Sequence, residues 1–144
     1  MNSSVVFESL AADSVYLRPL FLCLVQAGAP SHADDEMEGR LDLNHHIFRN
    51  PESTMMVWMK GDAFKSEGVF DGDLVIADSS LKPQPTQLVV VLINGQQRIR
   101  RLTRLEEKLY LTTDNGPSEL IEVEGNSSVQ ILAVVTFTIH TIPD

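Results

Sequence analysis

The chain has 144 residues, of which 43% are hydrophobic, so its length suits one modest core and its composition is that of a folded rather than a disordered protein. Its net charge of -9 disfavours direct, specific binding to DNA, because phosphate contacts require clustered lysine and arginine. The N-terminus lacks the pattern of a signal sequence, and apolar runs fall short of the roughly 18 residues of a membrane span, so we expect a cytoplasmic protein without membrane contact.

Residues 1–45 differ in composition from the rest and are predicted to form an N-terminal arm. Ser31 is a suitable N-cap for a short helix over 32–39, whose first turn would be acidic and therefore favoured by the helix dipole. A further turn or two of helix is expected within 41–48, before an Asn-Pro break. The part before Ala27 is expected to be extended and detachable.

Cys23 is the only cysteine, so an internal disulfide is excluded and a reducing compartment is expected. It lies in the apolar run from Leu20 to Val25, where a buried structural thiol is more common than a reactive one. We therefore do not expect Cys23 to act as a nucleophile.

From Thr54 onward the pattern is that of short strands separated by glycine and proline turns. The Asn94-Gly95 pair is the strongest two-residue signal for a β-hairpin. After it, the alternation places Ile99 on one face of a strand and Arg98 and Arg100 on the other. We expect a mainly β domain of several coiled sheets over residues 46–144, with strands at 55–59, 74–77, 88–93, 97–105, 108–113 and 129–139.

Five blocks appear along the chain in the order found in one known family. The blocks are Leu24 to Ser31, Arg40 to Asn44, Gly61 to Ile76, Gln97 to Leu102 and Val134-Val135. In this order they resemble UmuD-type proteins, the self-cleaving relatives of the LexA repressor that serve as accessory subunits of an error-prone DNA polymerase. The resemblance covers roughly residues 18–140 and implies a LexA/UmuD-type C-terminal β domain preceded by an extended arm with one or two short helices.

The resemblance also implies a catalytic serine in a Ser-Gly-Asp-Ser-Met type of motif. Gly61 and Asp62 match that motif, while Lys60 and Phe64 replace its first serine and its methionine. The nucleophile position falls on Ala63, which has no oxygen with which to attack a carbonyl. The run Asp71-Gly72-Asp73, which follows as in the family, supports the alignment.

The family activates its serine with a neutral lysine in the strand after the hairpin. Here that strand reads Ile99-Arg100-Arg101, so the general-base position falls on Arg100. An arginine side chain is effectively never deprotonated in a protein, whereas a desolvated lysine can reach a working pKa. We therefore expect a pseudo-peptidase that does not cleave itself by the usual route.

The cleavable bond of the family falls on Ala27-Gly28, the dipeptide that is also typical of LexA. Small residues allow an extended strand to enter a narrow cleft, and glycine tolerates the backbone turn that scission requires. One interpretation is a vestigial cleavage site that an active homologue cuts in trans. The alternative is a flexible arm with a small-residue kink, and the sequence does not choose between them.

Two other residue groups suggest chemistry, each with a simpler explanation. Ser66 with Lys65 is a candidate substitute dyad, but adjacent residues on a strand point to opposite faces, so we do not expect them to act together. His45-His46 suggests a metal site, but it lacks further ligands at a suitable spacing and is better explained as surface residues. We expect neither a metal nor another cofactor.

The arginines of the strand after the hairpin form the one short basic stretch. They can be a local nucleic-acid patch, or a solvated face that pairs with the acidic excess, which is the commoner arrangement. The stretch comprises Arg98, Arg100, Arg101 and Arg104.

By resemblance, the chain is expected to be a non-catalytic subunit in the SOS response and translesion DNA synthesis. It would form a homodimer, or a heterodimer with an active UmuD homologue, and bind a UmuC-type polymerase or the RecA filament. The alternative is a self-cleaving peptidase of the same family, seen here as an inactivated variant. A LexA-like repressor is disfavoured, because the region before Arg40 is acidic and shows no helix-turn-helix pattern of sufficient length.

Overall fold

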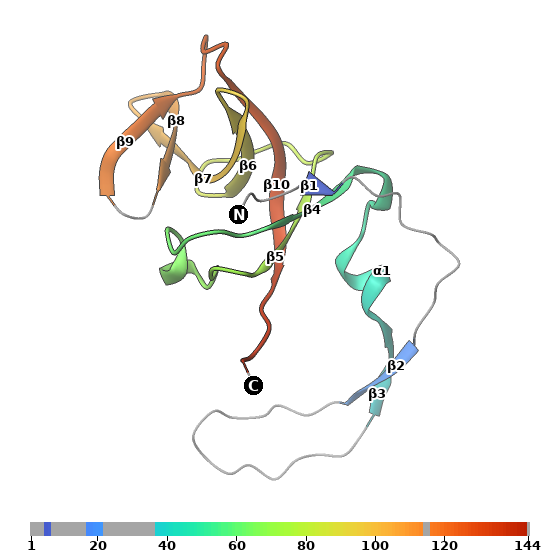
Figure 1. The fold of residues 1–144 in the computed structure, drawn as a ribbon. Coiled ribbons are helices and arrows are strands. Elements are labelled where there is room, and N and C mark those ends of the chain that lie inside the picture. The colour runs from blue at the N-terminus through green and yellow to red at the C-terminus, as the bar shows by residue number, and fades with distance from the viewer. Residues whose placement is uncertain (1–4, 7–16, 22–36, 114–115, 144) are drawn as a thin grey trace. The chain divides into compact units, whose positions relative to one another are not determined.

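The structure is a computed structural model that describes residues 5–6, 17–21, 37–113 and 116–143. The chain divides into two compact units (Figure 1). The smaller comprises Leu10–Arg49, and the larger combines Met1–Ser9 with Asn50–Asp144. Cys23, Ala27 and Gly28 lie outside the described residues.

The smaller unit is built on a two-stranded antiparallel sheet. Strand β2 (Leu17–Phe21) pairs with β3 (Met37–Asp42), and helix α1 (Leu43–Ile47) follows β3 directly. The Asp42 side chain caps this helix by accepting a hydrogen bond of 3.1 Å from the Asn44 backbone N–H.

The helix expected within 41–48 is confirmed as α1, but the helix expected over 32–39 is wrong for its described part. Residues 37–39 belong to β3, where Gly39 is paired with Leu20. Cap and dipole preferences contribute only about 1 kcal/mol each, so pairing with a distant strand overrides them. Residues 32–36 lie outside the described part of the chain.

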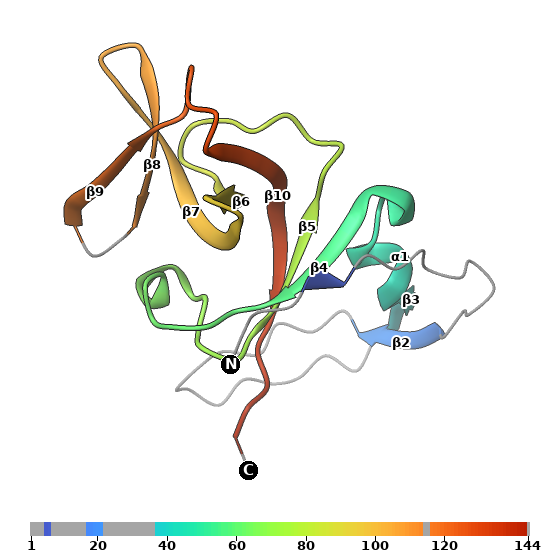
Figure 2. The same ribbon diagram turned by 45° about the horizontal axis from the view of Figure 1, so that its top comes forward.

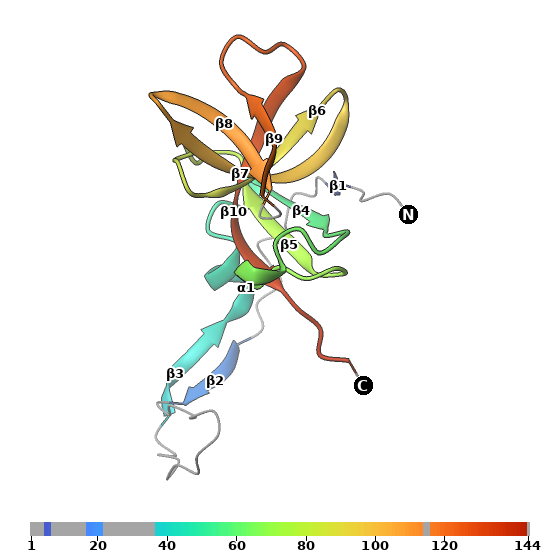
Figure 3. The same ribbon diagram turned by 90° about the vertical axis from the view of Figure 1, so that its left-hand side faces the viewer.

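The larger unit is an antiparallel sheet, and the predicted mainly β class is confirmed. Its eight strands are ordered β1-β4-β5-β10-β6-β7-β8-β9, and Figures 2 and 3 show that β6 to β9 curl rather than extend as a flat layer. The strands are β1 (Val5–Val6), β4 (Thr54–Trp58), β5 (Leu74–Asp78), β6 (Leu88–Ile93), β7 (Gln96–Leu105), β8 (Lys108–Thr113), β9 (Gly116–Glu122) and β10 (Val129–Ile139). Two short 3-10 helices, η1 (Pro51–Ser53) and η2 (Lys65–Glu67), complete the unit.

The β6–β7 hairpin turns at the dipeptide that the sequence indicates. Asn94 and Gly95 both have a positive φ, 51° and 77°, and the pair Ile93 and Gln96 closes the ladder on either side. Asparagine and glycine tolerate this left-handed backbone better than other residues, which is why the dipeptide predicts the turn.

Strand β10 lies between β5 and β6 and contains two irregularities in its pairing. The register shifts between Ile131 and Ala133 against β6, and between Val135 and Phe137 against β5. Such bulges bend a strand and increase its twist. With these two bulges, β10 pairs with β5 on one edge and with β6, at the start of the curled part of the sheet, on the other edge.

Two buried apolar clusters pack on opposite sides of the central strands. Val90 of β6 belongs to the first cluster, whereas its neighbours Val89 and Val91 belong to the second. Ala133 and Val134 of β10 divide in the same way. A strand buried on both faces reads as a continuous apolar run, which explains the composition of residues 88–93.

Asp78, at the end of β5, joins that strand to the segment that precedes β4. Its side chain is 5% exposed and accepts hydrogen bonds from Asn50 Nδ2 (2.7 Å) and Ser53 Oγ (2.7 Å), and from Ser80 through its backbone N–H (2.8 Å) and its Oγ (2.7 Å). Burial by itself raises the pKa of Asp78, but these four donors outweigh it and lower the pKa from 3.8 to about 2.

We predict a pH-dependent contribution of Asp78 to stability. Because its pKa is depressed in the folded protein, the contribution is complete above pH 3.8 and is lost as the pH falls through about 2. The shift corresponds to about 2 kcal/mol. Urea unfolding of the wild type and Asp78→Asn should therefore differ more at pH 6 than at pH 2.5. An equal difference at both pH values would show that the carboxylate charge is not what stabilises this junction.

Candidate functional site

The motif residues lie in one turn, residues 59–73, that connects β4 to β5. Backbone hydrogen bonds close its base, from Met59 N–H to the Asp73 carbonyl (2.8 Å) and from Gly72 N–H to the Met59 carbonyl (2.8 Å). Asp71 Oδ1 accepts a further hydrogen bond of 2.6 Å from Gly61 N–H. Gly61 and Gly72 have φ values of 98° and 87°, a region that residues with a Cβ rarely adopt.

Phe64 fills the interior of this turn and fixes the path of the chain next to Ala63. Its side chain is 0% exposed and belongs to the first apolar cluster. Its carbonyl accepts hydrogen bonds from the backbone N–H groups of Glu67 (3.0 Å) and Val69 (3.2 Å). Ala63 is half-buried and packs against the same cluster.

Strand β7 contacts the turn through Ile99 and Arg101. Ile99 belongs to the cluster that contains Phe64. The Arg101 guanidinium carbon lies 6.0 Å from the centre of the Phe64 ring, Arg101 Nη2 forms an ion pair with Glu67, and Nη1 donates to the Thr86 carbonyl (2.7 Å). Arg101 thus ties the turn to β7, a role that the sequence did not reveal.

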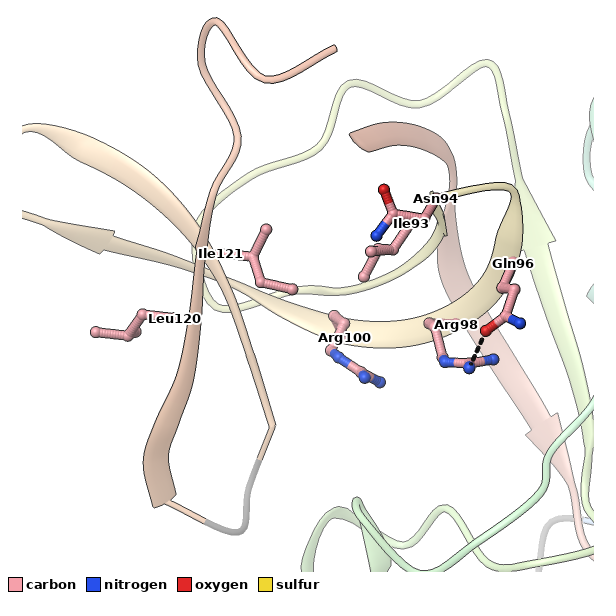
Figure 4. Close-up of a pocket in the computed structure, with 7 residues that line it drawn as sticks. All are labelled: Ile93, Asn94, Gln96, Arg98, Arg100, Leu120 and Ile121. Atoms are coloured by element: carbon pink, nitrogen blue, oxygen red, sulfur yellow. Dashed lines mark hydrogen bonds between the residues drawn. The ribbon is translucent and has the colours of Figure 1, made fainter. Parts of the chain in front are cut away.

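Arg100, the predicted general-base position, lies between these two contact residues on β7. Its side chain is half-buried, and Nη1 donates to the Ile99 carbonyl (2.9 Å). It also lines a pocket of about 480 Å³ (Figure 4). Ala63 packs against the apolar cluster that contains Ile99, the residue before Arg100. The assignment of Ala63 and Arg100 as the two dyad positions stays a prediction.

Asp73 is a buried carboxylate at the base of the turn, with 1% of its surface exposed. Its Oδ2 accepts a hydrogen bond from Phe70 N–H (2.9 Å), and its Oδ1 lies 2.5 Å from His140 Nδ1. The rings of Phe70 and His140 have centroids 4.8 Å apart. His140, the residue that follows β10, therefore contacts the turn at Asp73 and Phe70. The sequence offers no signal for this contact.

The other candidate residues differ in position, since Lys65 and Ser66 lie within the turn whereas His45, His46 and Ser53 lie outside it. Lys65 and Ser66 are exposed and belong to η2, so the expectation that they lie on a strand is wrong. Ser53, another serine near the turn in the sequence, donates a hydrogen bond to Asp78 instead. His45 and His46 are exposed on α1, and within the described residues no group of three or more histidine, cysteine or acidic side chains could hold a metal ion.

The turn and its strands agree with a known family. The Peptidase S24-like family profile matches residues 19–136. The chain belongs to the Peptidase S24-like family. This is a family of serine peptidases, and the predicted relation to the UmuD and LexA proteins is confirmed.

Curated relatives of this S24-like chain include proteins matched over most of their own length and a repressor matched over about half of it. Protein ImpA of Salmonella typhimurium is 34% identical over 131 residues, which cover 90% of this chain and 88% of ImpA. Protein MucA of Escherichia coli is 30% identical over 135 residues, covering 93% and 92%. LexA repressor 1 of Pseudomonas putida is 30% identical over 100 residues, which cover 69% of this chain and 49% of the repressor.

Among the described residues of this S24-like chain, no helix is long and apolar enough to cross a membrane. Its described helices are short, and α1 has five residues.

We predict that Phe64 stabilises the turn by filling it. Phe64→Ala should lower the free energy of unfolding by about 3–5 kcal/mol, because it leaves a cavity at a fully buried position. Phe64→Met, which restores the family's usual residue, should cost less than about 1.5 kcal/mol, since a flexible apolar side chain can refill the space. Urea unfolding monitored by circular dichroism measures both. Similar losses for the two variants would contradict a packing role.

Proposed function

We propose that the chain is a non-catalytic, UmuD-like accessory or regulatory subunit in the SOS response and translesion DNA synthesis. The observation that carries the proposal is the methyl group of Ala63 in a turn that is otherwise closed by its own hydrogen bonds. A serine peptidase needs an oxygen nucleophile at this point, and the aspartates and glycines that shape the turn do not supply one.

The second dyad position supports the same conclusion. Arg100 has five N–H donors and no acceptor, so it cannot take a proton from a nucleophile. Loss of one member of a coupled nucleophile and base pair lowers the rate on the order of a millionfold in a well-studied serine peptidase, and losing both members adds little more. The chain would therefore act by binding, as a homodimer or paired with an active UmuD homologue.

A protein partner is supported by an exposed apolar row on the β4–β5–β10 part of the sheet. Trp58 and Ile139 both pair with Leu74 of β5, from the strands on its two sides. Trp58 is 52% exposed and Ile139 is 42% exposed. The buried middle of β10 is not available to a partner, since Ala133 and Val134 are each 2% exposed. We propose this row as a contact surface for a second subunit, a UmuC-type polymerase or the RecA filament.

The first test of the proposal is self-cleavage followed by intact mass. The purified chain, incubated at mildly alkaline pH alone and with activated RecA filaments, should keep its full mass. Ala63→Ser with Arg100→Lys should release residues 1–27 if the two positions are the former dyad, because the pair then regains an oxygen and a titratable amine. Ala63→Ser alone is the matched control and should stay intact. Loss of residues 1–27 from the unmodified chain would overturn the proposal.

The same assay tests whether the arm remains a substrate. We propose that Ala27-Gly28 is a vestigial cleavage site that an active UmuD homologue can cut in trans. Adding such a homologue should produce a fragment that begins at Gly28, and Gly28→Val should prevent it, because a β-branched residue restricts the backbone at the scissile bond. If the mass of the chain stays unchanged in the presence of the active homologue, Ala27-Gly28 is not a substrate for cleavage in trans.

A binding experiment tests the apolar row. Trp58→Ala should weaken capture of a UmuC-type polymerase, or of an active UmuD homologue, by about tenfold or more, as expected for a large aromatic residue at the centre of an interface. Leu105→Ala is the matched control, since Leu105 is 43% exposed at the β7–β8 turn, away from the row. Equal capture by both variants and the wild type would exclude this surface.

A further inference from the structure

The pocket between the β6–β7 hairpin and β9 contains two of the chain's few positive charges. Arg98 and Arg100 line it, and its volume is about 480 Å³. Among the seven described residues that line the pocket there are two guanidinium groups and no carboxylate, although the whole chain has a net charge of -9. A concave site lined by one sign of charge concentrates ligands of the opposite sign.

The spacing of the two arginines suits an extended ligand. Arg98 and Arg100 are two residues apart on β7, and Figure 4 shows both side chains leaving the strand on the same side. Side chains on one face of a strand repeat every ~6.5–7 Å, and an extended peptide has the same repeat. Carboxylates at alternate positions of such a peptide would therefore face one guanidinium each, with the planar, charge-assisted geometry that arginine favours.

The rest of the lining suits a peptide better than a nucleic acid. Ile93 and Ile121 line the pocket from β6 and β9, and Figure 4 shows Ile121 extending toward the hairpin. Both pack against the second apolar cluster, so they present a fixed apolar wall. The described lining has no aromatic ring on which a base could stack, and the chain's negative charge opposes a polyanion at longer range.

Strand β9 offers backbone groups beside this pocket. It is last in the sheet order, so among the strands that the structure describes its outer edge is paired with no other strand. Leu120 and Ile121 of β9 line the pocket, which brings a bound extended segment next to this strand. An open edge of this kind can accept a peptide as an added strand.

We propose that this pocket binds an extended acidic segment of a protein partner, with carboxylates at alternate positions and an apolar side chain beside them. Arg98 and Arg100 bind the carboxylates. The apolar side chain of the ligand packs against Ile93 and Ile121. This inference goes beyond the proposed function, since it concerns binding alone and holds whether or not Arg100 occupies a former general-base position.

The test is fluorescence anisotropy with the full chain and a labelled nonapeptide in which glutamates alternate with leucines. A nonapeptide with glutamine in place of glutamate is the control ligand. Arg98→Gln and Arg100→Gln should each weaken binding of the glutamate peptide by about tenfold, as expected for a lost charge-assisted contact. Arg104→Gln makes the same charge change on β7 at an exposed residue outside the pocket lining and should change the affinity less than about twofold.

Four results would overturn the proposal. These are the absence of saturable binding, equal binding of the glutamine peptide, an equal loss in Arg104→Gln, and unchanged binding in both pocket variants. A labelled single-stranded oligonucleotide provides a further arm. If it binds and the pocket variants lose it while the glutamate peptide fails to bind, the site is one for nucleic acid. Circular dichroism checks each variant's fold, and Arg98→Gln, at an exposed residue, keeps the test decisive if Arg100→Gln does not fold.

Discussion

Strand β10 lies between β5 and β6, and hydrogen bonds on both of its edges join the two halves of the larger unit. Strands β5 and β6 do not pair with each other, so both depend on β10, which follows them along the chain. Its two bulges supply the bend between the flatter and the curled parts of the sheet. Both apolar clusters include a residue from β10, which makes this strand the common wall of the two cores.

The turn at residues 59–73 owes its shape to groups other than a catalytic hydroxyl. Asp71 and Asp73 bond backbone N–H groups within it, and Phe64 fills it. Neither of these carboxylate hydrogen bonds involves the side chain at residue 63, which is a methyl group. A turn of this kind can therefore lack a catalytic hydroxyl and still keep its backbone geometry. Retained geometry allows such a chain to keep serving as a binding partner, which is the basis of the function proposed above.

Local signals in the sequence were sufficient where neighbouring residues determine the structure. Asn94-Gly95 predicts its hairpin because both residues tolerate a positive φ, and the apolar run at 88–93 predicts a strand, which the structure shows to be buried on both faces. The strands β1, β2, β3 and β9 were not predicted, because their stability comes from partners elsewhere in the chain rather than from a local pattern.

In the candidate site, too, local sequence predicts some features, whereas contacts between distant residues could not be predicted. Gly61, Asp62 and Ala63 are recognised from the order of a motif, which local sequence preserves. The contacts of Arg101 with Phe64 and of His140 with Asp73 join residues 37 and 67 positions apart, and no sequence pattern indicates such a pair. Periodicity did place Arg98 and Arg100 on one face of β7, but only the curl of the sheet brings β9 close enough to make a pocket there.

Strand β10 follows the other described strands of the sheet along the chain, and this order has a consequence for synthesis on the ribosome. Strands β4 to β9 emerge first, and until Val129 to Ile139 follow, the facing edges of β5 and β6 have no strand between them. Unpaired edges of this kind are templates for association with other chains. Nascent or truncated chains that end before Val129 therefore expose two unpaired edges of apolar strands, which chaperones would have to shield until β10 has been synthesised.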